Sequence, residues 1–246
     1  MKMQNLFALI VAGTLMHGAL AQDEQTTRLN AALAAPERPA ENKARDEARK
    51  PVESIQFFGI KTGDTVIEMI AAGGWFTEVL SAAVGPQGKV YASNPPGLVD
   101  PKTEEALHKR LGNVEAVNTA LSETSIDGTA DAALLALNLH DIYSGFNGQA
   151  GGEATTVAFL KEIYAELKPG GVLGVIDHVG VAGQDNAKLH RIPAQLARDL
   201  LMKAGFTIEA ESPMLANPAD DHTKAVFDPS IRSKTDQFMF RARKPA

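Results

Sequence analysis

The sequence contains no cysteine among its 246 residues, so no disulfide framework can hold the fold together. It is also short of positive charge: 24 Lys and Arg stand against 30 Asp and Glu, for a net charge of −6. A chain with this balance has no general attraction to nucleic acid or to anionic lipid surfaces. We therefore expect an enzyme-sized globular fold stabilised by a buried core, with no nucleic-acid partner.

The one long apolar run lies at the N-terminus, where Lys2 precedes the stretch "LFALIVAGTLMHGALA". Ala19-Leu20-Ala21 has the small-x-small pattern that signal peptidase cleaves, and the polar Gln22 follows it. The lack of a following cysteine excludes lipoprotein attachment, and the lack of a preceding Arg-Arg pair argues against twin-arginine export. We expect residues 1–21 to be a cleaved signal peptide and the mature protein to be periplasmic or secreted, without stable membrane insertion. The alternative is an uncleaved N-terminal anchor.

The chain after this segment divides into a leader and one domain. Residues 22–42 are rich in Ala, Pro and Glu and are expected to form a flexible leader. Over residues 43–246, short apolar runs alternate with helical patterns, which is typical of an open, doubly wound α/β sheet. The last two predicted strands, "FTIEAES" and "TDQFMFRAR", have no helical pattern between them, which predicts an antiparallel hairpin at one sheet edge. The predicted fold is a mainly parallel sheet with helices on both faces.

The stretch "VIEMIAAGGWFTEVL", residues 66–80, begins as a buried strand and ends as an amphipathic helix. Gly73 and Gly74 at the join allow close backbone approach, and the helix start offers unpaired N–H groups to an anion. Glu68 lies inside the strand, where a carboxylate is costly unless a cation or a hydrogen-bond donor meets it. A ligand with an ammonium and a carboxylate group would satisfy both features. The alternatives are a plain structural turn and a Glu68 paired with a nearby arginine.

Four segments taken in order carry a resemblance to a known family: "VIEMIAAGGWFTEVL", "GKVYASN", "DAALLALNLHDIY" and "LKPGGVLGVIDH". Together they resemble class I S-adenosylmethionine-dependent methyltransferases. More narrowly, the chain looks like an exported bacterial methyltransferase-like family with a Gly-Gly-Trp turn and an "NP…DDHTK…FDPSIR…TDQF" tail. The resemblance covers roughly residues 42–244. It implies a Rossmann-like seven-stranded sheet with an antiparallel C-terminal strand, the cofactor S-adenosyl-L-methionine and a small-molecule methyl acceptor.

The resemblance also implies which residues bind the cofactor. Glu68 matches the acid that approaches the methionyl amine, and Asn94 occupies the position of the acid that commonly holds the ribose hydroxyls. The superfamily usually has glycine at the positions of Ile70 and Ala72, so this loop is bulkier than the usual one. The adenine contact falls in the "NTALSE" region and is not assigned to a residue. The implied cofactor-binding residues are Glu68, Ala72, Gly73, Gly74 and Asn94.

Catalytic candidates follow the fourth predicted strand in "LNLHDIY", where the superfamily places residues that face the transferred methyl. These candidates are Asn138, His140 and Tyr143. His140 would act as a general base with a pKa near its ordinary value of about 6.5, oriented by Asp141. His178 and His222 are expected nearby on the acceptor side, beneath a lid formed by "ANPADDHTKAVFDPS". The alternative for His140 is a strand-end histidine bonded to the backbone.

Two further hypotheses stay open at this point. The first is a catalytically inactive, exported ligand-binding relative, supported by Ile70, Ala72 and Asn94 and by the synthesis of S-adenosylmethionine inside cells. The second is a metal-dependent hydrolase, because several side chains have the chemistry of divalent-cation ligands: His140, Asp141, Asp177, His178, Asp221 and His222. No local ligand spacing supports it, such as two histidines one helical turn apart. We therefore expect no metal ligands.

Overall fold

The computed structural model describes residues 21–120, 126, 128–146, 148 and 150–246 of the chain. The expected signal peptide lies outside these residues except for Ala21, and so does half of the "NTALSE" segment. No helix within the described residues is long and apolar enough to cross a membrane.

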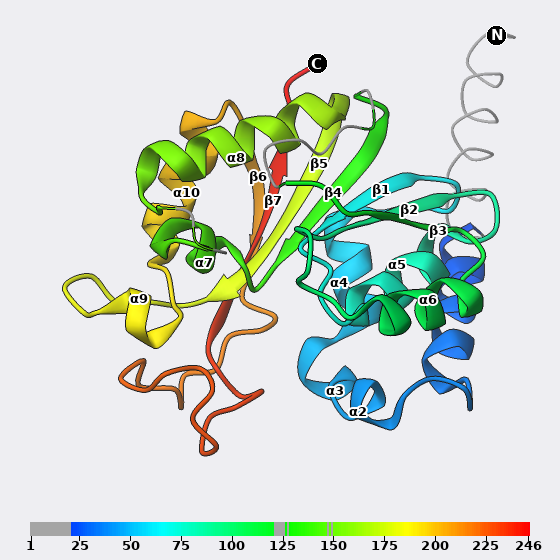
Figure 1. Ribbon diagram of the computed structural model, residues 1–246, viewed down its shortest axis with the longest axis horizontal. Coiled ribbons are helices and arrows are strands. Elements are labelled where there is room, and N and C mark those ends of the chain that lie inside the picture. Colours follow the sequence, from blue (N-terminus) through cyan, green and yellow to red (C-terminus); the bar gives the residue numbers. More distant parts are fainter. Residues whose placement is uncertain (1–20, 121–125, 127, 147, 149) are drawn as a thin grey trace, which may run out of the picture.

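The described residues form a seven-stranded sheet with the order β3-β2-β1-β4-β5-β7-β6. Neighbouring strands from β3 to β5 pair in parallel, and β7 lies antiparallel between β5 and β6. This confirms the predicted Rossmann-like sheet and its antiparallel ending (Figure 1). The strands are β1 Thr65–Met69, β2 Lys89–Ser93, β3 Val114–Val117, β4 Ala130–Ala136, β5 Leu167–His178, β6 Thr207–Ser212 and β7 Gln237–Arg243. The "LKPGG" segment is the first part of β5.

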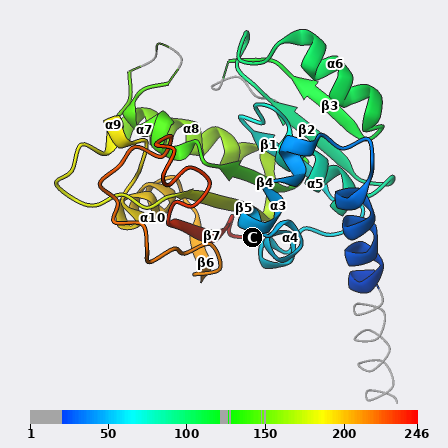
Figure 2. The ribbon, with the colours of Figure 1, turned by 90° about the horizontal axis from the view of Figure 1, so that it is seen from below.

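Helices cover both faces of the sheet, as Figures 1 and 2 show. Successive side chains of a strand point to opposite faces, so β1 serves two cores. Ile67 joins the apolar cluster formed with α8 and α10, and Val66 joins the cluster formed with α4 and α5. The helices are α2 Ala40–Lys43, α3 Asp46–Arg49, α4 Pro51–Phe58, α5 Trp75–Val84, α6 Pro101–Arg110, α7 Leu139–Ser144, α8 Glu153–Glu166, α9 Asn186–Leu189 and α10 Ala194–Lys203.

The segment expected as a flexible leader is a packed helix over residues 21–34, so this expectation is wrong. Leu29 is fully buried in the cluster with α4 and α5. Gln25 donates hydrogen bonds from Nε2 to the carbonyl oxygens of Ile60 (2.9 Å) and Ala83 (3.0 Å). The physical reason lies in the alanine content, which favours helix, and in the 25, 29, 33 spacing, which places Gln25, Leu29 and Leu33 on one face.

The connection between β6 and β7, residues 213–236, lies at the carboxyl ends of the parallel strands together with α9 (Figure 1). Its Asp220 forms a fully buried ion pair with Arg191, which precedes α10. The fold thus holds this long irregular segment beside the sheet edge where α/β proteins bind their ligands.

Candidate functional site

The turn after β1 has a strained backbone. Ile70 and Ala72 adopt φ angles of 56° and 48°, in the left-handed region that bulky residues rarely occupy. Gly74 has a φ of 78° and leads directly into α5. These are the positions where the resemblance implies a glycine-rich, cofactor-binding turn. Strained backbone conformations of this kind are common at binding sites, where the ligand requires a particular backbone conformation.

The predicted cofactor residue Asn94 follows β2 and is bonded to this turn. Its Oδ1 accepts a hydrogen bond from the Ala72 N–H at 2.9 Å, and the Ala71 N–H donates to the Ser93 carbonyl oxygen at 3.0 Å. Asn94 is 3% exposed. In this structure its amide oxygen therefore fastens the turn to the end of β2. Ala72 and Gly73 themselves are exposed, so the turn presents its backbone outward.

Glu68 of β1 is buried under α5. The Thr77 hydroxyl donates a hydrogen bond to its carboxylate at 2.5 Å. Burial raises the pKa of Glu68 to about 8, although the Thr77 hydrogen bond and the positive charge of Arg49 act in the opposite direction. Among the described residues no ion pair neutralises this carboxyl. With this raised pKa the Glu68 carboxyl keeps its proton at neutral pH, and a cation placed beside it would lower its pKa and ionise it.

The turn lies at the point where the strand order reverses, between β1 and β4. Asn138 at the start of α7 donates from Nδ2 to the Ile70 carbonyl oxygen at 3.4 Å, so the ends of the two strands are in contact. Open α/β sheets bind ligands in the crevice at this point. The sequence prediction that Asn138 lies near the glycine turn is consistent with this contact.

A hollow of about 310 Å³ opens beside this point. We call it the arginine-lined hollow. Arg49 stacks over the Trp75 ring, with its Cζ atom 4.7 Å from the ring centroid. The β6–β7 connection, which contains the segment predicted to form a lid, supplies part of the wall. The lining residues are Arg45, Ala48, Arg49, Leu137, Asn138, His140, Asp141, His178, Val226, Phe227, Arg232, Ser233 and Gln237.

His140 is held by a buried carboxylate at the end of β5. Asp177 accepts from the His140 backbone N–H at 2.8 Å and pairs with its Nδ1 at 2.7 Å. Burial lowers the pKa of His140, but Asp177 and Asp141 outweigh it and raise the pKa to about 10. The imidazole is then protonated at neutral pH. This does not fit the expected general base with a pKa near 6.5.

His178 has the opposite character. Burial lowers its pKa to about 4, so this ring is neutral at pH 7. Its Nδ1 shares a hydrogen bond with the Thr235 hydroxyl at 2.8 Å. The His140 and His178 ring centroids are 5.7 Å apart. The structure therefore brings these two predicted residues together on one wall of the arginine-lined hollow.

Other predicted residues lie elsewhere. Tyr143 borders a separate hollow of about 430 Å³ next to residues 182–187, so it does not share a wall with Asn138 and His140. His222 pairs through Nε2 with Asp236 Oδ2 at 3.0 Å within the β6–β7 connection, and it does not line the arginine-lined hollow. Asp221 is exposed.

Arg49 and His190 are among the residues at this site that sequence reasoning missed. Arg49 lies in a charge-rich segment that reads as a solvent-exposed helix, yet it stacks on Trp75 and lines the hollow. His190 follows α9, and its Nδ1 lies 3.0 Å from Asp141 Oδ1. No pattern near either residue in the sequence indicates these contacts, because tertiary packing creates both.

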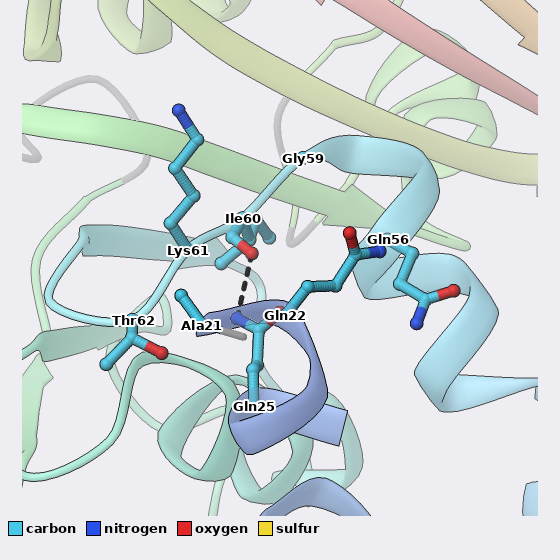
Figure 3. Close-up of a pocket in the computed structure, with 8 residues that line it drawn as sticks. All are labelled: Ala21, Gln22, Gln25, Gln56, Gly59, Ile60, Lys61 and Thr62. Atoms are coloured by element: carbon cyan, nitrogen blue, oxygen red, sulfur yellow. Dashed lines mark hydrogen bonds between the residues drawn. The ribbon is translucent and has the colours of Figure 1, made fainter. Parts of the chain in front are cut away.

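A larger hollow of about 460 Å³ lies between the helix over residues 21–34 and the turn before β1 (Figure 3). Figure 3 shows Gln25 bonded to the Ile60 carbonyl oxygen there, and the Lys61 side chain pointing away. This hollow is at the amino end of β1. The carboxyl ends are where such sheets bind ligands, so the arginine-lined hollow is the candidate site.

No protein-family model and no curated protein matches the chain. Solved structures do. A methyltransferase of Aquifex aeolicus that depends on S-adenosylmethionine is 20% identical, with a TM-score of 0.59 over 81% of this chain and 98% of that one. The 1,6-didemethyltoxoflavin-N1-methyltransferase of Burkholderia thailandensis, solved with S-adenosylhomocysteine, is 18% identical, with a TM-score of 0.57 over 94% and 90%. The cyclase SpnF is 18% identical, with a TM-score of 0.61 over 92% and 95%.

These similarities define the fold as the Rossmann-like fold of class I S-adenosylmethionine-dependent methyltransferases. The cyclase among the neighbours shows that the same fold carries more than one chemistry. The function of this chain therefore has to be argued from its own site.

Proposed function

We propose that this protein is an S-adenosylmethionine-dependent methyltransferase that acts on a small molecule. The observation that carries the proposal is the turn after β1 at the strand-order reversal, whose Ala72 and Gly73 are exposed beside the arginine-lined hollow. Glu68 is buried and has no ion pair within the described part of the chain, which suits the ammonium group of the cofactor's methionyl part. The alternative of an inactive ligand-binding relative is not favoured, since the structural neighbours include methyltransferases with named substrates.

The arginine-lined hollow is the proposed acceptor site, with Asn138 and His140 on its wall. Arg45, Arg49 and Arg232 give it positive charge, which suits an anionic or electron-rich acceptor. Methyl transfer to such a nucleophile depends mainly on alignment of donor and acceptor, so it does not require a general base. Tyr143 has no role in this proposal, because it borders a different hollow.

A substitution at Gly73 tests the cofactor turn. A Cβ atom added at Gly73 would have no atom within 4 Å, so Gly73→Leu should fold normally and project into the proposed cofactor site. We expect its affinity for S-adenosylhomocysteine, measured by calorimetric titration, to fall at least about 10-fold, or 1.4 kcal/mol. Gly74→Val is a poorer test, because its Cβ would lie 2.5 Å from a Leu107 methyl group and its φ is 78°.

Gly112→Leu is the matched control for this test. Gly112 is also exposed, in the turn after α6, and a Cβ atom added there would have no atom within 4 Å. Its affinity should equal that of the unmodified protein. If Gly73→Leu and Gly112→Leu bind S-adenosylhomocysteine equally well, the cofactor turn has been assigned to the wrong place.

We also propose that the protein belongs to an exported family and acts in the periplasm or outside the cell, which rests on the apolar run and Ala19-Leu20-Ala21. N-terminal sequencing of protein from the exported fraction should find Gln22 as the first residue. The helix over residues 21–34 would then begin at the new terminus. Recovery of intact Met1 on membrane-embedded protein would contradict this.

A further inference from the structure

Three metal-ligating side chains converge beside the arginine-lined hollow. His140 and Asp141 lie in the first turn of α7, and His190 directly follows α9. Asp141 Oδ1 lies 3.3 Å from His140 Nε2 and 3.0 Å from His190 Nδ1. One ligand atom from each residue falls within 4.8 Å of the others. Ligand atoms about 2.1 Å from a tetrahedral zinc ion are about 3.4 Å apart, so two of the three separations already suit one shared ion.

The buried nitrogen of His140 is the second observation that points to a ligand. His140 is 3% exposed, and its Nε2 has no hydrogen-bond partner within the described residues. Asp141 Oδ1 at 3.3 Å attracts it but is not aligned as a hydrogen-bond acceptor. A buried polar atom without a partner is costly, so such atoms in native proteins usually meet a ligand, water or ion.

Asp177 orients the His140 ring so that its Nε2 atom can bind a metal. It binds the opposite ring atom, Nδ1, at 2.7 Å and also holds the His140 backbone N–H. Metal binding displaces the proton from Nε2, and with the remaining hydrogen on Nδ1 the imidazole presents its Nε2 lone pair toward Asp141. Metal-bound histidines characteristically have such a carboxylate behind them, which fixes the tautomer and the ring orientation.

We propose that His140, Asp141 and His190 form a binding site for a divalent transition-metal ion, with Asp177 as the orienting carboxylate. Two imidazoles and one carboxylate select zinc or another late first-row ion over magnesium or calcium, which prefer oxygen ligands. Three protein ligands leave at least one coordination position open. His140 and Asp141 also line the arginine-lined hollow, so an oxygen of a small molecule bound there can fill that position.

This site differs from the metal hypothesis that the sequence allowed. Of the six residues considered there, the structure gathers only His140 and Asp141 as ligands, places Asp177 behind His140, and adds His190. His190 is 37% exposed, which gives an ion a route from solvent. The proposal does not depend on methyl transfer, because its direct consequence is metal binding by the protein alone.

The test is a titration of the chelator-treated protein with Co²⁺, followed by the visible absorption of the bound ion. We expect one ion per chain, displaced by Zn²⁺. His190→Ala and Asp141→Ala should each lower the affinity at least about 10-fold, because loss of even an outer-sphere partner costs that much. Asp177→Asn should also weaken Co²⁺ binding, because Asp177 orients His140 without contacting the ion itself. Bound Zn²⁺ should also raise the melting temperature of the unmodified protein.

His222→Ala is the matched control, because His222 also pairs with a carboxylate, Asp236 Oδ2 at 3.0 Å, but away from the proposed site. It should bind Co²⁺ as the unmodified protein does. Melting temperatures show whether each variant is folded, and the two ligand variants are independent of one another. The proposal is overturned if the unmodified protein gives no spectral change, if both folded ligand variants bind normally, or if His222→Ala weakens binding equally.

Discussion

Replacing Asp220 by alanine is expected to lower the free energy of unfolding by about 3 to 5 kcal/mol. The side chains of Asp220 and Arg191 are both 0% exposed. They form a two-point ion pair, with Arg191 Nη1 and Nη2 lying 2.9 and 3.1 Å from the two carboxylate oxygens. Alanine would leave the guanidinium buried without its counter-charge, which is more costly than never having buried the pair.

Asp220 has a further role that enlarges the effect. Its carboxylate accepts backbone hydrogen bonds from Asp236 (2.8 Å) and His222 (3.0 Å), so it ties the interior of the β6–β7 connection to its last residue. Urea unfolding, followed by circular dichroism, measures the loss. Asp221→Ala is the control, because the described contacts of this exposed neighbour are with Thr223. Similar losses for the two variants would contradict the structural role given to Asp220.

Much of the fold could be predicted because periodicity is a local signal. β1 reads as a nearly continuous apolar run, and the structure buries Val66, Ile67 and Met69 on both faces of a parallel strand. The missing helix before the last strand correctly predicted the antiparallel ending. The helix over residues 21–34 was missed, since its composition was read as a leader although Leu29 packs into the core. Its packing depends on partners distant in the sequence, such as Ile60 and Ala83, which lie 35 and 58 residues from Gln25.

The sequence predicted residues of the site only where they lie at the ends of strands. Asn138, His140 and His178 end neighbouring strands, and the structure places all three on one hollow. The protonation state of His140 was not predictable, because it is set by Asp177, a residue 37 positions away that is fully buried. The same holds for His190, which reaches Asp141 through the packing of α9 beside α7. Residue type suggested these functions, but tertiary contacts decide which atoms meet.

Glu68→Gln is expected to remove a loss of stability that the unmodified protein suffers as pH rises. The folded state holds the Glu68 proton up to its raised pKa of about 8, whereas the unfolded chain releases it near the ordinary value of 4.5. Below pH 4.5 the Glu68 carboxyl is protonated in both the folded and the unfolded state, so its contribution to the free energy of unfolding is fully present. Between the two pKa values the unfolded state binds fewer protons, so the free energy of unfolding falls as pH increases. The loss is complete above about pH 8.

The size of this effect follows from the separation of the two pKa values. A rise from 4.5 to about 8 corresponds, at roughly 1.4 kcal/mol per unit, to a loss of at most about 5 kcal/mol. Glutamine cannot ionise, but its amide oxygen can still accept the Thr77 hydroxyl, which donates to Glu68 at 2.5 Å. The difference in stability between Glu68→Gln and the unmodified protein should therefore grow in favour of the variant between pH 5 and pH 9.

Urea unfolding of both proteins across this pH range measures the difference directly, because all other titrating groups are shared. Thr77→Val removes the hydroxyl that stabilises the ionised carboxylate, so it should deepen the loss at alkaline pH. Saturating S-adenosylhomocysteine should reduce the loss in the unmodified protein, since the proposed function places the ligand's ammonium group beside Glu68. A pH-independent difference between Glu68→Gln and the unmodified protein would show that burial does not hold the proton on this carboxyl.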